Sequence, residues 1–143
     1  MNTNICFYNE DVNYRLAYKE KIRLWILATI KQEKKKAGDI SYVFCSDEYL
    51  LEINKEHLNA DYLTDVITFD FTEKNQVSGD IFISVDRVKE NAKLYEQKYY
   101  QEMLRVILHG VLHLCGYKDK TDDEEKQMRE KEDYYLQKFE LIS

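Results

Sequence analysis

Apolar residues recur along the chain at two different spacings, and the spacing distinguishes predicted strands from predicted helices. Runs of β-branched and aromatic residues, typical of strands, fall at residues 4–9, 40–46, 65–71 and 80–85. Apolar residues three or four positions apart, as on one face of a helix, predict helices at residues 14–35, 48–58, 87–99, 100–115 and 121–141. The predicted order of elements is therefore β-α-β-α-β-β-α-α-α.

Residues that cap or break helices support several of these boundaries. Ser84 or Asp86 can begin the third helix, and Thr121 with Glu124 forms a capping box for the last one. Gly38 is expected to separate the first helix from the second strand. The element order predicts an α+β fold, a small sheet with helices packed on it, and the third and fourth strands can pair as a hairpin. The length of 143 residues predicts that residues 1–143 form one domain.

Composition and charge narrow the class of protein. The net charge of −6 and the pI of about 5.2 count against a general nucleic-acid binder, and no DNA is expected as a partner. RNA would have to be contacted where positive charge is locally concentrated. No apolar run approaches the roughly 18 residues of a membrane span, so no membrane partner is expected. The first residues lack the order of a secretion signal, which predicts a cytoplasmic protein.

The three cysteines, Cys6, Cys45 and Cys115, are odd in number and have no paired spacing. Each stands beside apolar residues. We therefore expect reduced core thiols, neither a disulfide framework nor a metal site built from cysteine pairs.

Two histidines stand out in the most apolar predicted helix. The stretch RVILHGVLHLCGYKDK, residues 105–120, places His109 and His113 four residues apart. Four residues of helix turn by about 400°, so both imidazoles lie on one face. Burying two imidazoles without partners costs a few kcal/mol each, whereas a divalent cation accepts a lone pair from both. The pattern is compatible both with a metal site and with two packed histidines, and the third histidine, His57, is expected on the surface.

The residues that follow the pair can complete such a site. Gly116 can adopt the left-handed conformation that ends a helix, so the chain can fold back and bring Asp119 toward the histidines. Two histidines and one carboxylate leave a fourth position open for water, as in catalytic zinc sites. Gly110 stands where peptidases with an H-E-x-x-H motif carry their glutamate base. The usual peptidase mechanism therefore lacks its proton acceptor.

Other polar residues near this helix have both a functional and a structural interpretation. Asp65 opens a predicted strand and can orient a ligand histidine or accept a proton, or simply form a polar turn. Arg105 can bind a phosphate, and Glu102 can support the site, but each is also common as an ion-paired helix residue. Lys118 and Lys120 flank Asp119 and would place positive charge beside the metal.

Three segments together resemble a known family. HGVLHLCGYKD resembles the signature H-G-x-L-H-L-x-G-Y-D-H of the YbeY family, metal-dependent endoribonucleases that are also called rRNA maturation factors. Upstream, TDVITF (residues 64–69) is similar to the family's T-D-V-L-S-F, and GDIFIS (residues 79–84) to its G-D-I-x-I segment. The order and separation of the segments also match, so the resemblance spans most of the chain from about Asn54 onward.

The resemblance implies a zinc-dependent, single-strand-specific endoribonuclease. It implies a role in ribosomal RNA processing, notably maturation of the 3′ end of 16S rRNA, and in ribosome quality control, with the small ribosomal subunit as partner. The implied fold is α+β, a small mixed β-sheet with packed helices and a zincin-like metal helix. The family's first two metal histidines correspond to His109 and His113, and Asp65 and Arg105 are the candidate catalytic residues.

The chain departs from the family pattern at three places. Asp119 stands where the family has its third histidine, and a harder, anionic ligand predicts a zinc site that also tolerates manganese or other divalent ions. Leu58 stands where the family usually has an arginine, so a phosphate contact there is not expected. Leu63 and Asp70 replace prolines. Two alternatives stay open: a zincin-like metallopeptidase, and a non-catalytic ribosome-assembly protein with a structural metal.

Overall fold

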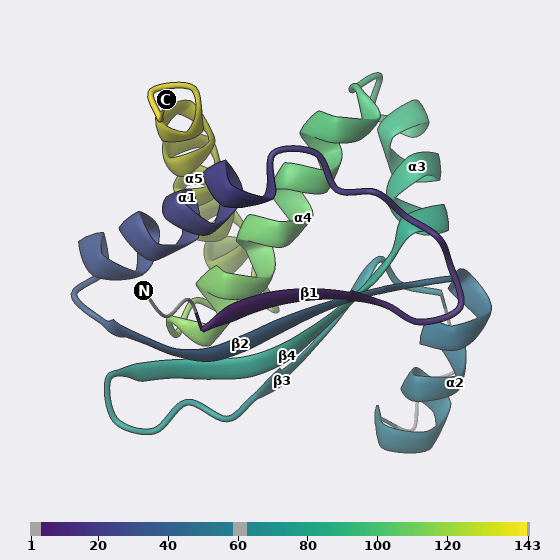
Figure 1. Cartoon of the computed structure of the whole chain (residues 1–143), viewed down its shortest axis with the longest axis horizontal. Helices are drawn as coiled ribbons and strands as arrows, with labels where there is room; N and C mark the ends of the chain where they lie inside the picture. Colours follow the sequence, from purple (N-terminus) through teal and green to yellow (C-terminus); the bar gives the residue numbers. More distant parts are fainter. Residues whose placement is uncertain (1–3, 59–62, 143) are drawn as a thin grey trace.

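The computed structural model describes residues 4–58 and 63–142, and in these the elements follow the predicted order (Figure 1). The strands are β1 (Ile5–Asn9), β2 (Lys36–Cys45), β3 (Val66–Asp70) and β4 (Gln76–Ser84). The helices are α1 (Lys19–Gln32), α2 (Asp47–Leu58), α3 (Val85–Leu94), α4 (Tyr99–Leu114) and α5 (Asp122–Phe139).

The strands form one mixed sheet in the order β1-β2-β4-β3. β2 runs parallel to both β1 and β4, and β3 pairs with β4 as the predicted antiparallel hairpin. Helices α1, α3, α4 and α5 lie on one face of the sheet, and α2 lies on the other (Figure 1). The expectation of an α+β fold with a small mixed sheet is confirmed.

The boundary between α1 and β2 differs from the prediction. β2 begins at Lys36, and Gly38 lies inside the strand and not in the turn. The turn falls instead at Lys34, which has a φ of 62°. A β-carbon on Gly38 would lie 2.1 Å from the side-chain oxygen of Ser78 on β4. The prediction was wrong because this glycine permits a close contact between strands that are distant in sequence.

Both ends of α3 can be traced to single residues. Ser84 caps its start, since the Ser84 hydroxyl accepts a hydrogen bond from the backbone N–H of Arg87 at 3.1 Å. The helix ends at Leu94, five residues before the predicted end. Glu96 follows with a φ of 55°, outside the range of a right-handed helix.

Helix α4 is the most buried helix of the described residues and packs directly on the sheet. Gly110 makes this close approach possible, because a β-carbon there would lie 2.8 Å from the side chain of Ile81 on β4. The buried hydroxyl of Tyr42 on β2 also donates to the backbone oxygen of Ile107 at 2.8 Å. These contacts fix the distance between α4 and the sheet and the rotation of α4 about its axis, and α4 carries both histidines.

The described cysteines are free, with Cys45 and Cys115 buried and Cys6 partly buried. Across residues 4–58 and 63–142, no helix is both long and apolar enough to cross a membrane.

Replacing Tyr42 by phenylalanine removes its hydrogen bond to α4 and leaves the ring in place. We expect Tyr42→Phe to lower the free energy of unfolding by about 1 kcal/mol, measured as a lower urea midpoint at unchanged slope. The control is Tyr18→Phe, where the side chain is 71% exposed, and its free energy of unfolding should stay within about 0.5 kcal/mol of wild type. Equal midpoints for both variants would show that the Tyr42 bond does not hold α4 to the sheet.

Candidate metal centre

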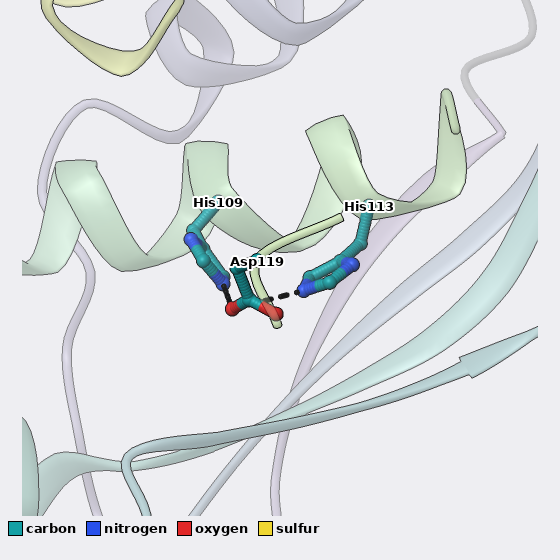
Figure 2. Close-up of side chains that lie close together, drawn as sticks. All are labelled: His109, His113 and Asp119. Carbon is teal, nitrogen blue, oxygen red and sulfur yellow. Dashed lines mark ion pairs between the residues drawn. The ribbon is translucent and has the colours of Figure 1, made fainter. Parts of the chain in front are cut away.

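His109 and His113 project from the same face of α4, and Asp119 meets them from the segment that follows the helix (Figure 2). The Nε2 atom of His109 lies 3.2 Å from Oδ2 of Asp119, and Nε2 of His113 lies 3.4 Å from the same oxygen. The three groups are each partly exposed, so a ligand can reach them from solvent. Among the described residues, these three are the only histidine, cysteine or acidic side chains that lie close enough together to hold a metal ion.

Two of the three separations between these atoms fit tetrahedral coordination of an ion such as zinc. Ligand atoms about 2.0–2.1 Å from a tetrahedral ion are about 3.3 Å apart, close to both measured separations. The remaining pair of ligand atoms lies within 4.8 Å, which a small movement of either ring can close. The donor set of two imidazoles and one carboxylate also suits zinc, and it leaves one position for water or substrate.

The reversal of the chain after α4 brings Asp119 to the histidines. Gly116 has a φ of 113°, its N–H donates to the His113 oxygen at 3.0 Å, and the N–H of Tyr117 donates to the Leu112 oxygen at 3.1 Å. These two bonds form a Schellman motif, which confirms the predicted left-handed glycine. The predicted capping box is also confirmed, so Thr121 starts α5 immediately after the segment.

A second contact holds this segment from the side. The Tyr117 hydroxyl donates to Glu33 at 2.7 Å, at the end of α1. Glu33 also accepts a hydrogen bond from Tyr135 and lies 3.5 Å from the ammonium of Lys131. Burial alone would raise the pKa of Glu33, but these donors lower it, so the carboxylate stays charged and keeps its bond to Tyr117.

Glu132 on α5 makes a shorter contact to a histidine than Asp119 does. Its Oε2 lies 2.7 Å from Nδ1 of His109, and the side chain of Glu132 is almost fully buried. With the proton on Nδ1, His109 donates to Glu132 and directs the lone pair of Nε2 toward Asp119. This is how carboxylates orient metal-binding histidines in proteins.

The two imidazoles have opposite pKa shifts. Burial would lower the pKa of His109, but the hydrogen bond to Glu132 and the charges of Glu132 and Asp119 outweigh it and raise the pKa. Burial and the neighbouring His109 lower the pKa of His113, which outweighs the attraction of Asp119. His113 is therefore the histidine more readily available as a neutral ligand at neutral pH.

A cavity of about 800 Å³ adjoins this group, where α3, α4 and α5 meet the start of β3. Asp65 lines it and accepts a long hydrogen bond of 3.4 Å from Asn91, and burial raises the pKa of Asp65. Arg105 lines it too, but its guanidinium is bound to Glu132 at 2.7 Å and to Asp133 at 2.8 Å. The structure thus places both candidate catalytic residues beside His109, with Arg105 engaged by two carboxylates.

The other described residues considered for the site do not contact His109 or His113. Lys118 and Lys120 are exposed on the segment that carries Asp119, and Glu102 lines the cavity from the first turn of α4. His57 is exposed on α2, edge-on to the ring of Phe69. Leu58 ends α2 and is exposed, while residues 59–61 of the segment NKEHLNAD lie outside the described residues.

Sequence reasoning missed Glu132, although the chain carries a signal for it. The buried residues of α5 are Met128, Glu132, Tyr135 and Phe139, spaced as one face of a helix. An acidic residue within such an apolar stripe needs a buried partner. His109 and Arg105 are the partners of Glu132.

Comparison with known proteins identifies a close group of relatives. The sequence model of the family described as "Endoribonuclease YbeY" matches residues 4–140. The chain is 51% identical over 133 residues to "Endoribonuclease YbeY" of Cytophaga hutchinsonii, covering 92% of this chain and 93% of that one. It is 48% identical over 132 residues to the protein of the same name from Parabacteroides distasonis, again covering 92% and 93%.

A solved structure has a similar fold. The solution structure of a Thermotoga maritima protein matches with a TM-score of 0.70 at 29% identity, covering 94% of this chain and 88% of that one. The arrangement of sheet and helices described above is therefore shared with an experimentally determined structure.

The contact between Glu132 and His109 predicts a pH-dependent loss of metal affinity on mutation. At pH 8 we expect Glu132→Gln to weaken the zinc Kd by about 10-fold or more, because His109 loses the carboxylate that orients it. At pH 6 the loss should be smaller. Glu132 raises the pKa of His109, so protons compete with zinc in the wild type, and the variant is relieved of part of that competition.

The matched control is Asp133→Asn, because Asp133 contacts Arg105 and no histidine within the described residues. Its zinc Kd should stay within about two-fold of wild type at both pH values. Competition titration with a chromophoric chelator measures all three proteins. An unchanged Kd for Glu132→Gln at pH 8 would refute the orienting role.

Proposed function

The chain belongs to the YbeY family of endoribonucleases, and from this membership we propose that it is a zinc-dependent enzyme that cleaves single-stranded RNA. One observation of the structure carries the metal dependence. Nε2 of His109 and Nε2 of His113 converge on one carboxylate oxygen of Asp119 at 3.2 and 3.4 Å, beside a cavity open to solvent. The carboxylate ligand leads us to expect that other divalent ions can replace zinc.

A divalent ion held by these three residues would polarise a phosphoryl oxygen and make water a better nucleophile. Asp65 lines the same cavity as His109, and burial raises the pKa of Asp65 toward the range of a proton acceptor. We assign it the task of accepting a proton from the attacking water. Glu132 holds His109 in the tautomer that presents Nε2, and Arg105 balances the buried charge of Glu132.

We further propose that the substrate is ribosomal RNA of the small ribosomal subunit. Processing of the 3′ end of 16S rRNA and ribosome quality control, in the cytoplasm, are the roles implied by the sequence motifs. Lys118 and Lys120 are exposed on either side of Asp119 and supply local positive charge for a phosphodiester in an acidic protein.

The packing of α4 weighs against a zincin-like peptidase. Position 110, where such a peptidase carries its glutamate, lies against the Ile81 side chain, and a β-carbon there would approach within 2.8 Å. A glutamate at this position would have to displace the Ile81 side chain or move α4 away from the sheet.

Replacing His113 by alanine tests the proposed mechanism. We expect His113→Ala to lose bound zinc and to lower kcat/KM for a single-stranded RNA by at least about 100-fold, because a ligand of the catalytic ion is removed. The urea midpoint measured without metal should change little, since His113 is partly exposed. Zinc content, cleavage kinetics and unfolding are measured on the same preparations.

The control is His57→Ala, which removes an exposed histidine of α2 and should keep wild-type zinc content and cleavage. Wild-type cleavage by His113→Ala would refute a metal mechanism at this site. Zinc binding and co-sedimentation with small-subunit particles, without metal-dependent cutting by the wild type, would instead identify a ribosome-assembly protein with a structural metal.

A further inference from the structure

The cavity beside the metal ligands extends well beyond them. On the side of α3 its walls are Asn91 and Tyr95, and α4 contributes Glu102. Helix α5 closes it with residues that include Arg129. From α4 it is lined by Glu102, Arg105, Val106 and His109, so it runs along this helix from His109 toward the start of the helix. The metal chemistry proposed above does not use this extension.

Glu102 is the unusual wall residue. Glu102 is only 7% exposed and lines the cavity. No described residue donates a hydrogen bond to its carboxylate. Burial raises the pKa of Glu102, and the nearby Asp65 raises it further, against the attraction of Arg105 and Arg129. A buried carboxylate that faces a cavity without a donor can accept hydrogen bonds from a bound ligand.

The charge of the walls indicates which part of an RNA fits here. Carboxylates outnumber the cationic groups Arg105, Lys126 and Arg129, and Arg105 is already bound to Glu132 and Asp133. Such a cavity repels phosphate and favours groups that donate hydrogen bonds. The phosphates of a bound strand are better placed near the exposed Lys118 and Lys120.

Tyr95 provides a surface on which a base can stack. It follows the last residue of α3, is 59% exposed, and lines the cavity. No aromatic ring of the described residues packs against it, unlike the tyrosines that pair with other rings in the fold. Exposed aromatic side chains of this kind hold the bases of single-stranded RNA by stacking.

We propose that this cavity is a subsite for one nucleobase of the RNA, stacked on Tyr95 and recognised by Glu102, and that it prefers bases with an exocyclic amino group to uracil. The inference rests on the proposed function. The amino groups of cytosine, adenine and guanine can donate to a carboxylate. Uracil has a single N–H on its pairing edge, between two carbonyl oxygens that a carboxylate repels.

The test uses the zinc-loaded full chain and single-stranded RNAs that differ at one nucleotide on either side of the cleaved bond. At one position, cytosine in place of uracil should raise kcat/KM by about tenfold, the effect of one added hydrogen bond to a charged group. Glu102→Gln should reduce this ratio to within about two-fold, because an amide can also donate to the uracil oxygen. Zinc content should stay at the wild-type value.

Tyr95 is tested at the same position with an abasic nucleotide. Tyr95→Ala should raise KM by about 5- to 150-fold, the range expected for loss of one stacked base, and Tyr95→Phe should restore it. With the wild type, replacing the base by an abasic nucleotide should raise KM by a similar factor. With Tyr95→Ala, the abasic nucleotide should raise KM no further. The control is Tyr8→Ala, a tyrosine of β1 with a similar exposure of 52% outside the cavity, which should keep the wild-type KM.

The outcomes separate this inference from the proposed function. If the wild type cleaves RNA with no base preference at any position, and Tyr95→Ala keeps the wild-type KM, the base subsite is wrong while the endoribonuclease stands. If the wild type with zinc cleaves no single-stranded RNA, the proposed function fails and the subsite fails with it.

Discussion

The reversal of the chain at Gly116 is the constraint on which the candidate metal centre depends. A helix can present two histidines one turn apart, but it cannot present a third ligand at the same point without a long gap in sequence or an abrupt turn. Gly116 provides the turn through its φ of 113°, and Asp119 then meets both imidazoles. The Schellman motif before the segment and the capping box after it fix both of its ends.

The site is also organised by a surplus of buried negative charge. Glu132 is almost fully buried between His109 and Arg105, and Asp65 and Glu102 line the adjoining cavity with pKa values raised by burial. Together with Asp119, Asp122 and Glu125 they outnumber the cationic groups of the cavity walls, Arg105, Lys126 and Arg129. A divalent cation between the imidazoles and Asp119 would offset part of this charge, so the surroundings favour metal binding as well as the ligands themselves.

The sequence was sufficient where the relevant residues are neighbours along the chain. The order of elements, the capping box at Thr121 and the left-handed Gly116 followed from local patterns and are confirmed. The sequence failed where contacts join distant segments. Glu132 is 23 residues from His109, Glu33 is 84 residues from Tyr117, and Gly38 serves a contact with a later strand. No local spacing reports such contacts, because they exist only once the helices and strands have packed.

Crystals of the chain grown with zinc, measured at the zinc absorption edge, test the central claim most directly. We expect one strong anomalous peak per chain, about 2.0–2.2 Å from Nε2 of His109, Nε2 of His113 and a carboxylate oxygen of Asp119. A fully loaded protein whose peak lies elsewhere, with Asp119 turned away from both imidazoles, would contradict the account.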